Sequence, residues 1–210
     1  MREFSQDFQS ELNELMKWRR DVRHFKPDPV DPDLLRTCLD AFQRAPSVGL
    51  SEPWRIVGVN SPQARQKSLE NYKAANADAL ASYEGERAKL YASLKLSGMT
   101  DAPVQLAVFC DEASPKGSGV GVQTMPEMRR YSVVSAIMSF WLVTRAYGLG
   151  LGWVSILDPV QLRTDLDLPE NWSLVAYLCV GWPKEETETP ELETVGWEMR
   201  DAQLTTLIER

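Results

Sequence analysis

The sequence predicts an α+β fold in which a mixed β-sheet packs against a buried central helix. Helical and strand-like stretches alternate too irregularly for a doubly wound parallel sheet. Residues 133–143 are apolar on almost every side, which is typical of a helix covered over most of its girth, in a core or in a dimer interface. The Gly117-x-Gly119-x-Gly121 run neither follows a strand nor opens a helix, so it is not a dinucleotide-binding fingerprint.

The first half of the chain contains three predicted helical regions and one strand. Apolar residues recur at helical spacing in the first two regions, and Asp31 can cap the second, where Pro32 suits the first turn. A loop of small residues held by two prolines then precedes the strand. The expected elements are helices over 4–16, 31–44 and 63–96 and a strand over 54–60.

The second half alternates strands with helices. Residues 103–110 are apolar almost without interruption, as in a strand that is buried on both faces. Residues 111–126 are rich in glycine and proline and predict a loop. The other expected elements are the central helix over 127–147, strands over 151–157 and 172–182, and a short helix over 159–166.

Length and composition narrow the class of protein. A chain of 210 residues predicts one domain spanning 1–210, and its net charge of −7 argues against general nucleic-acid binding. No secretory leader and no apolar run of about 18 residues is visible, so we expect a cytoplasmic protein. Cys38, Cys110 and Cys179 lie in apolar contexts and predict buried thiols. One histidine, His24, cannot build a zinc site with scattered cysteines, so we expect no metal.

A basic cluster stands where the first helix gives way to a loop. Arg19, Arg20 and Arg23 surround Asp21, and three prolines between residues 27 and 32 prevent the helix from continuing. Guanidinium groups gathered at such a place form a forked set of donors that suits a phosphate. The alternative interpretation is a solvated surface patch.

The polar helical region over 63–96 also allows two interpretations. Its apolar residues are sparse, so burial of its own side chains holds it weakly. This property favours a mobile cover or an interface. A plain surface helix is the alternative.

Four stretches together carry a resemblance to a known family. In this order they cover about residues 8–200, and their combination resembles the flavin-dependent nitroreductase superfamily. The resemblance implies a nitroreductase-like fold and a homodimer with two FMN sites at the subunit interface, each built from both chains. The stretches are Arg19-Arg20-Asp21-Val22-Arg23-His24-Phe25, Ala45-Pro46-Ser47-Val48-Gly49-Leu50-Ser51-Glu52-Pro53-Trp54, Gly150-Leu151-Gly152-Trp153-Val154-Ser155-Ile156-Leu157 and Gly181-Trp182-Pro183.

The resemblance also implies which residues bind the flavin. Arg19, Arg20 and Arg23 would hold the FMN phosphate and ribityl end, and Arg200 would reach the phosphate as well. Ser47 would approach the flavin from the partner subunit. A helical lid insertion over about 63–100 would cover the site. The remaining implied contacts are Val22, Gly152, Trp153 and Val154, with Leu96 and Met99 at the end of the lid.

Asp21 separates two branches of the superfamily. Members that reduce nitroaromatics or quinones with NAD(P)H usually carry Arg-Arg-Ser-x-Arg at this place. The branch with Arg-Arg-Asp-x-Arg fragments reduced FMN with O2 into 5,6-dimethylbenzimidazole, the lower ligand of vitamin B12, and erythrose 4-phosphate. The resemblance therefore implies that reduced FMN, delivered by a separate flavin reductase, is the substrate. An NAD(P)H-dependent nitroreductase or quinone reductase and a non-catalytic flavin-binding protein are the alternatives.

Asp21 and Ser155 are the candidate catalytic residues. A carboxylate is a usable general base toward the ribityl C1′, whereas a serine hydroxyl is a poor one. The alternative is that Asp21 only neutralises Arg19 or Arg23. Ser155, which follows Gly-Trp-Val, would hydrogen-bond to the flavin. Glu52 replaces the glutamine that often precedes Pro-Trp, so the charge of the site would differ if this side chain faced the flavin.

Overall fold

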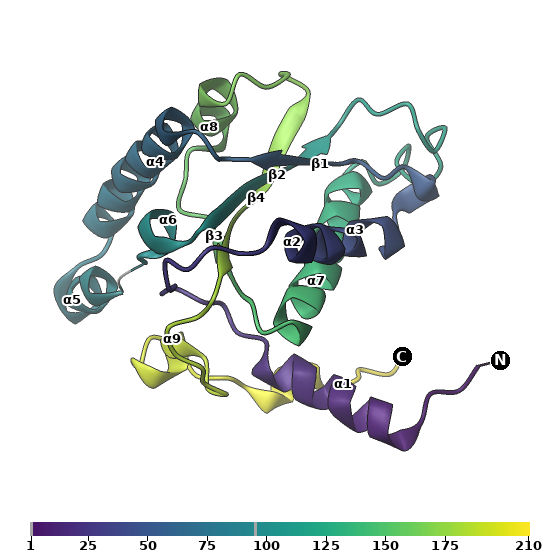
Figure 1. Cartoon of the computed structure of the whole chain (residues 1–210), viewed down its shortest axis with the longest axis horizontal. Coiled ribbons are helices and arrows are strands. Elements are labelled where there is room, and N and C mark those ends of the chain that lie inside the picture. Colours follow the sequence, from purple (N-terminus) through teal and green to yellow (C-terminus); the bar gives the residue numbers. More distant parts are fainter. Residues whose placement is uncertain (1, 95) are drawn as a thin grey trace.

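A four-stranded sheet forms the centre of the molecule (Figure 1). The computed structural model describes residues 2–94 and 96–210; Met1, and Lys95 within the expected lid insertion, lie outside the described residues. The strand order is β1-β2-β4-β3, which leaves β3 at one edge. The strands are β1 (Trp54–Gly58), β2 (Val104–Asp111), β3 (Gly150–Val154) and β4 (Trp172–Gly181).

The direction of the strands differs from the expectation. All three neighbouring strand pairs are antiparallel, so the prediction of a mixed sheet is wrong. Hydrophobic patterning locates a strand but carries no information on the direction in which it runs. Within the described residues, parallel pairing is limited to one isolated bridge between Asp21 and Leu151. This bridge places the basic cluster along the free edge of β3.

Helices cover both faces of the sheet (Figure 1). One face carries α7 (Met128–Ala146), beside which lie α2 (Pro32–Leu39) and α3 (Ala41–Arg44). On the other face, α6 (Gly98–Asp101) and α8 (Pro159–Asp165) contact β4, and α4 (Pro62–Ala81) packs on α8. The other helical elements are α1 (Gln6–Trp18), η1 (Val48–Leu50), α5 (Gly85–Ser93), α9 (Glu191–Thr194) and η2 (Ala202–Thr205).

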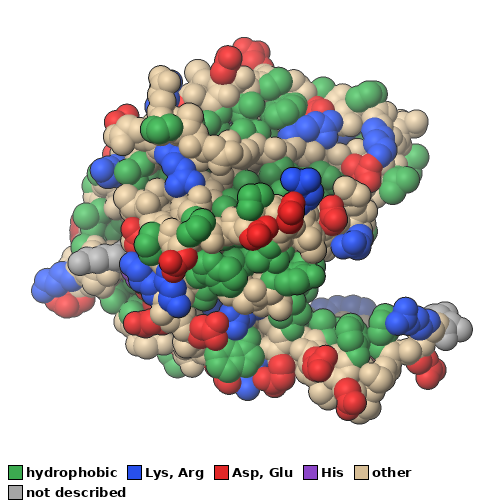
Figure 2. All heavy atoms as spheres, in the orientation of Figure 1, with side chains coloured by type: hydrophobic (Ala, Val, Ile, Leu, Met, Phe, Trp, Pro, Cys, Tyr) green, Lys and Arg blue, Asp and Glu red, His purple; other side chains and the backbone are tan. Residues whose placement is uncertain are grey.

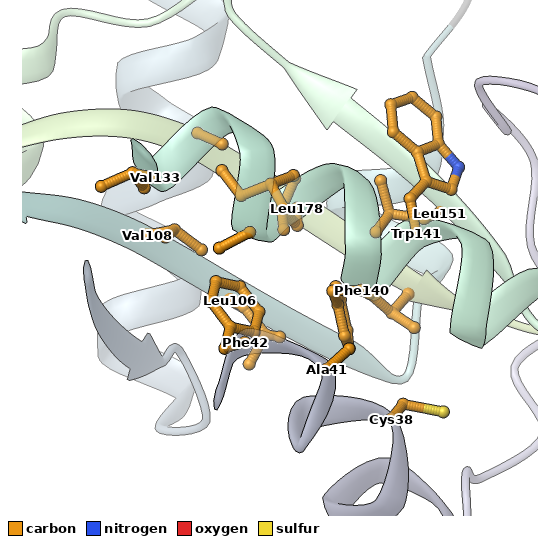
Figure 3. Close-up of a cluster of buried hydrophobic side chains, with 14 of the residues drawn as sticks. Cys38, Ala41, Phe42, Leu106, Val108, Val133, Phe140, Trp141, Leu151 and Leu178 are labelled. Carbon is orange, nitrogen blue, oxygen red and sulfur yellow. The ribbon is translucent and has the colours of Figure 1, made fainter. Parts of the chain in front are cut away.

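The two faces of the sheet build two separate hydrophobic clusters. Because side chains alternate along a strand, Leu106 and Val108 of β2 join the cluster under α7, and Ala107 and Phe109 join the opposite one. Figure 3 shows Phe140 of α7 near Phe42 of α3 in the first cluster, and their ring centroids are 5.6 Å apart. The apolar periods of the sequence therefore identified residues that meet in the core.

The central helix is covered on one side only within a single chain. Phe140 and Ile137 are fully buried against the sheet, but Tyr131, Val134 and Met138 remain 52%, 41% and 42% exposed. We expected most of the helix surface to be buried, but within one chain only the side that faces the sheet is covered. The exposed apolar half is available for contact with another molecule.

Local chemistry explains where the helices begin and break. Three helices start with a cap and a proline, at Asp31-Pro32, Ser61-Pro62 and Asp158-Pro159. The region expected as one helix over 63–96 is divided between α4 and α5, since Gly85 takes a left-handed φ of 58°. The helix expected over 31–44 is divided at Asp40 into α2 and α3.

Further properties concern the surface and the cysteines. None of the helices among the residues described is long and apolar enough to cross a membrane. Figure 2 shows acidic, basic and apolar side chains interspersed over one face. Cys38, Cys110 and Cys179 are free and buried, as expected. Burial raises the pKa of Cys110 and Cys179 to about 12, so both thiols stay protonated at neutral pH.

Candidate functional site

The site segment, Arg19–Phe25, runs along the edge of β3 after α1 has ended. The backbone N–H of Val22 donates to the Leu151 carbonyl at 3.0 Å. The approach is so close that a Cβ on Gly152 would lie 2.1 Å from the Val22 carbonyl oxygen. Only glycine fits at position 152, so the Gly-Leu-Gly sequence of β3 is what admits the site segment.

Asp21 is bound directly to β3. Its Oδ1 accepts the backbone N–H of Trp153 at 2.8 Å, while its Oδ2 lies 3.9 Å from Nε of Arg23. The side chain remains 43% exposed, yet the surrounding protein desolvates the carboxylate and raises its pKa. The Trp153 N–H and the charges of Arg23 and Arg19 oppose this shift without cancelling it. A carboxylate in this setting accepts a proton more readily than an exposed one.

Four arginines gather beside Asp21 and form what we call the arginine pocket. Arg19, Arg20, Arg23 and Arg200 line a cavity of about 150 Å³ together with Asp21, Pro190, Glu191 and Leu192. Burial lowers the pKa of Arg19 and of Arg20, and the charge of Arg200 lowers both further. With four guanidinium groups against the carboxylates of Asp21 and Glu191, the pocket keeps an excess of positive charge that suits an anion.

The donors of the arginine pocket fit a phosphate. The Nε of Arg20 is buried and has no hydrogen-bond partner among the described residues, so a donor is left over. The guanidinium of Arg19 is held in place over the ring of Trp141, with its carbon 4.7 Å from the ring centroid. Guanidinium groups recognise phosphate oxygens through paired N–H donors. On the basis of these contacts, the pocket suits a phosphate group.

A larger cavity of about 480 Å³ lies next to the arginine pocket. Arg20, Asp21 and Arg23 line both cavities, so the site segment forms a shared wall. Trp18 and Trp141 line the larger cavity as well, together with the charged residues Arg145, Glu185, Glu186 and Glu191. An extended ligand with a phosphate at one end and a planar apolar group at the other would match this combination.

The structure brings together part of the predicted site. Val22, Gly152, Trp153 and Val154 meet where the site segment crosses β3, and Ser155 is exposed directly after that strand. Leu96 is half-buried and packs against the hydrophobic cluster on the α8 side of the sheet. Met99 is a member of that cluster and only 3% exposed. Neither Leu96 nor Met99 lines the two cavities described above.

Ser47 is remote from the site segment within one chain. The N–H of Val48 donates to Oγ of Ser132 at 3.0 Å, which places this loop at the first turns of α7. Arg145, which lines the larger cavity, lies in the last turn of the same helix. Thirteen residues of helix correspond to about 20 Å. Ser47 can therefore join a flavin site only from another chain.

The loop around Ser47 is held in a strained conformation. Gly49, Leu50 and Glu52 have positive φ values of 55°, 53° and 44°. Such values are costly for the two residues with side chains, and they persist where the surroundings fix them. Oγ of Ser47 accepts the N–H of Glu52 at 3.1 Å, and the Glu52 carboxylate forms an ion pair with Lys116. The charge of Glu52 is thus matched within its own chain.

Two groups of residues escaped prediction from the sequence. Trp197, near the C-terminus, contacts Arg87, Tyr83 and Tyr91, which lie in or next to α5. Oε1 of Gln105, a buried polar residue in an apolar strand, accepts a hydrogen bond from the Tyr177 hydroxyl at 2.5 Å. The first contact has no local signature in the sequence. The second could have been suspected, because a glutamine between apolar residues of a buried strand needs a partner.

Comparisons with known proteins agree with this fold. Residues 16–182 match the model of the nitroreductase family. The chain is 51% identical over 197 residues to a 5,6-dimethylbenzimidazole synthase of Rhodospirillum rubrum, covering 94% of this chain and 93% of the relative. It is 44% identical over 195 residues to a protein of that name from Rhodobacter capsulatus, covering 93% and 94%.

A solved structure shares the architecture. Iodotyrosine deiodinase bound to FMN and 3-iodo-L-tyrosine superposes with a TM-score of 0.73 at 21% identity, covering 95% of this chain and 97% of the other. The expected nitroreductase-like fold is confirmed. The family model spans most of the sequence, from the end of α1 to the residue after β4. The chain belongs to the nitroreductase family.

Proposed function

We propose that this protein is a 5,6-dimethylbenzimidazole synthase, which converts reduced FMN and O2 into 5,6-dimethylbenzimidazole and erythrose 4-phosphate. The observation that carries the proposal is the sequence similarity to two curated synthases, which extends over nearly the full length of each chain. Asp21, within Arg-Arg-Asp-x-Arg, is the residue that distinguishes this reading from an ordinary nitroreductase. Reduced FMN would come from a separate flavin reductase.

The arginine pocket would bind the phosphate of FMN. Arg20 offers its unpartnered Nε–H, and Arg19, Arg23 and Arg200 add charge around the same cavity. The backbone of β3 at Gly152, Trp153 and Val154, together with Val22, would lie along the flavin. When bound, reduced FMN supplies the electrons that activate O2 and the carbon skeleton of the product.

Asp21 would act as the general base. The Trp153 N–H fixes Oδ1, which leaves Oδ2 as the proton acceptor toward the ribityl C1′. The raised pKa strengthens the carboxylate as a base. Neutralisation of Arg23 is a weaker explanation, because 3.9 Å separates the charged atoms. Ser155, exposed after β3, would donate a hydrogen bond to the flavin.

The proposal includes a homodimer whose subunits share the flavin sites. Support comes from Ser47, which can enter a site only from a second chain, and from the exposed apolar side of α7. The N-terminal helix exposes apolar residues as well. The exposed α1 residues are Phe8, Leu12 and Met16, at 43%, 38% and 46%.

We further propose one domain over 1–210 with residues 63–100 as the lid. That part contains α4, α5 and α6, and its end contacts the site segment: the N–H of Ser97, just before α6, donates to the Arg23 carbonyl at 3.2 Å. Leu96 and Met99 would contact the flavin only after a rearrangement, since neither lines a cavity. Buried free cysteines support a reducing compartment, and we propose the cytoplasm.

Product analysis distinguishes the proposed activity from its alternatives. The protein is incubated with FMN, a chemical reductant and air, and small products are identified by mass; oxidation of NADH is followed in a separate incubation. A synthase yields 5,6-dimethylbenzimidazole and oxidises NADH slowly or not at all. An NAD(P)H-dependent nitroreductase or quinone reductase oxidises NADH and leaves FMN intact. A flavin-binding protein remains yellow and yields no new aromatic compound.

A further inference from the structure

Trp197 is clamped by side chains of the lid. The guanidinium carbon of Arg87 lies 4.1 Å from the centroid of the indole ring, and Nη1 of Arg87 donates to the Trp197 carbonyl at 3.0 Å. Tyr83 and Tyr91 pack on the same ring, with centroids 5.6 and 6.1 Å away. A cation–π contact combined with a hydrogen bond and two aromatic contacts makes a defined attachment.

The segment that bears Trp197 is a compact turn that ends in the arginine pocket. Gly196 takes a left-handed φ of 75°, and the N–H of Trp197 donates to the Leu192 carbonyl at 2.8 Å. Leu192 and Arg200 line the arginine pocket. Two residues lie between Trp197 and Arg200, so the three steps from one Cα atom to the other span no more than about 11 Å. The position of Arg200 thus depends on where Trp197 is held.

The place of Arg200 in that pocket brings like charges together. The charge of Arg200 disfavours the protonated forms of Arg19 and Arg20 and lowers their pKa, and nearby carboxylates (Asp21 at Arg19, Glu188 and Glu193 at Arg20) offset part of this repulsion. The attachment of Trp197 to the lid opposes this repulsion. An anion in the pocket would remove it, because each guanidinium would then face an opposite charge.

We propose that Trp197 and Arg87 are positioning residues that hold Arg200 in the arginine pocket, so that binding of the FMN phosphate and docking of α5 favour each other. The inference rests on the proposed function, because its ligand is FMN. Linkage makes the effect reciprocal: a docked lid tightens phosphate binding, and a bound phosphate stabilises the docked lid. Neither residue needs to touch the flavin.

The first test compares two ligands that differ only in the phosphate. Dissociation constants of oxidised FMN and riboflavin are measured by flavin fluorescence for wild type, Arg87→Ala, Trp197→Leu and Arg200→Ala. We expect Arg87→Ala and Trp197→Leu to weaken FMN binding about tenfold and to leave riboflavin binding unchanged. Lys89→Ala is the matched control, since Lys89 lies on α5 but pairs only with Glu86 among the described residues. Adding Arg87→Ala to Arg200→Ala should cause little further loss.

The outcomes separate the inference from the proposed function. Equal losses for both ligands, or effects of Arg87→Ala and Arg200→Ala that multiply, would overturn the positioning role while leaving the flavin site intact. Failure of the wild type to bind FMN would overturn the proposed function and this inference together.

A second measurement uses the wild type alone and does not depend on how the variants fold. Trypsin cleavage within α5, at Arg87 or Lys89, is followed at saturating FMN, saturating riboflavin and without ligand. We expect FMN to slow cleavage several-fold more than riboflavin does. The same rate with both flavins contradicts the coupling.

Discussion

The carboxylate of Asp21 accepts a hydrogen bond from the backbone N–H of Trp153 at 2.8 Å, across 132 residues of sequence. This contact joins the site segment to the edge strand and leaves one carboxylate oxygen available. The same edge is extended by the backbone bond from Val22 to Leu151. The geometry of the candidate site therefore depends on how closely the site segment can approach β3.

Gly152→Ala should separate the site segment from β3. The added Cβ would meet a backbone oxygen at 2.1 Å, which cannot rotate away, so we expect a loss of about 3 kcal/mol in the free energy of unfolding, measured with urea. Gly58→Ala is the control, because its Cβ would meet the flexible end of Asn60 at 2.8 Å, and its effect should stay within about 0.5 kcal/mol. Equal effects of the two substitutions would refute this role of Gly152.

Asp21→Asn should stabilise the protein at neutral pH. Burial raises the pKa of Asp21 in the folded protein above its ordinary value of 3.8. At a pH between 3.8 and this raised pKa, the folded state holds a proton that the unfolded state has lost. The free energy of unfolding consequently falls as pH rises through this interval, and the whole penalty applies at pH 7. Asparagine carries no charge and keeps an oxygen for the Trp153 N–H.

The Tm of Asp21→Asn should therefore exceed that of the wild type at pH 7, and the difference should vanish below pH 3.8. A lower Tm for the variant at pH 7 would mean that the attraction of Asp21 to Arg23 and Arg19 outweighs the cost of burial.

The buried pair of Tyr177 and Gln105 should contribute to stability as a unit. The Tyr177 hydroxyl donates to Oε1 of Gln105 at 2.5 Å, and Nε2 of Gln105 donates to the Met99 carbonyl at 2.8 Å. Tyr177→Phe leaves one acceptor unpaired and should lower the free energy of unfolding by about 1–3 kcal/mol. Gln105→Leu leaves both the Tyr177 hydroxyl and the Met99 carbonyl without this partner and should lower it by more. The double variant should lose less than the sum of the two single losses. If urea denaturation shows that the single losses simply add, the two residues are not coupled.

Oxidised FMN should raise the Tm through the arginine pocket. At about 100 times its dissociation constant a ligand stabilises by about 2.7 kcal/mol, which corresponds to about 5–10 °C for a chain of this size. Arg20→Leu removes the buried, unpartnered Nε and should reduce the shift strongly at the same FMN concentration. Arg36→Leu, at an exposed site on α2, should leave it unchanged. A full shift in Arg20→Leu would exclude this residue as a ligand of the FMN phosphate.

The sequence predicted those features that local patterns determine. The central helix was expected over 127–147 and spans Met128–Ala146, and the strand expected over 172–182 is β4, Trp172–Gly181. Strand direction was mispredicted, because it depends on how the connections fold back. The association of Arg19 and Arg20 with Arg200 was available only from the resemblance, since no local pattern relates residues so far apart. The clamp of Arg87 on Trp197 was missed for the same reason.

The role of Asp21 as general base is tested by measuring, by mass, the 5,6-dimethylbenzimidazole formed per FMN consumed for wild type and Asp21→Asn supplied with reduced FMN and air. FMN binding to the variant is confirmed separately. We expect product from the wild type and at least a hundredfold slower formation by the variant, the lower range for loss of a general base. Product at a near-native rate from Asp21→Asn, or intact FMN with the wild type, would contradict this expectation.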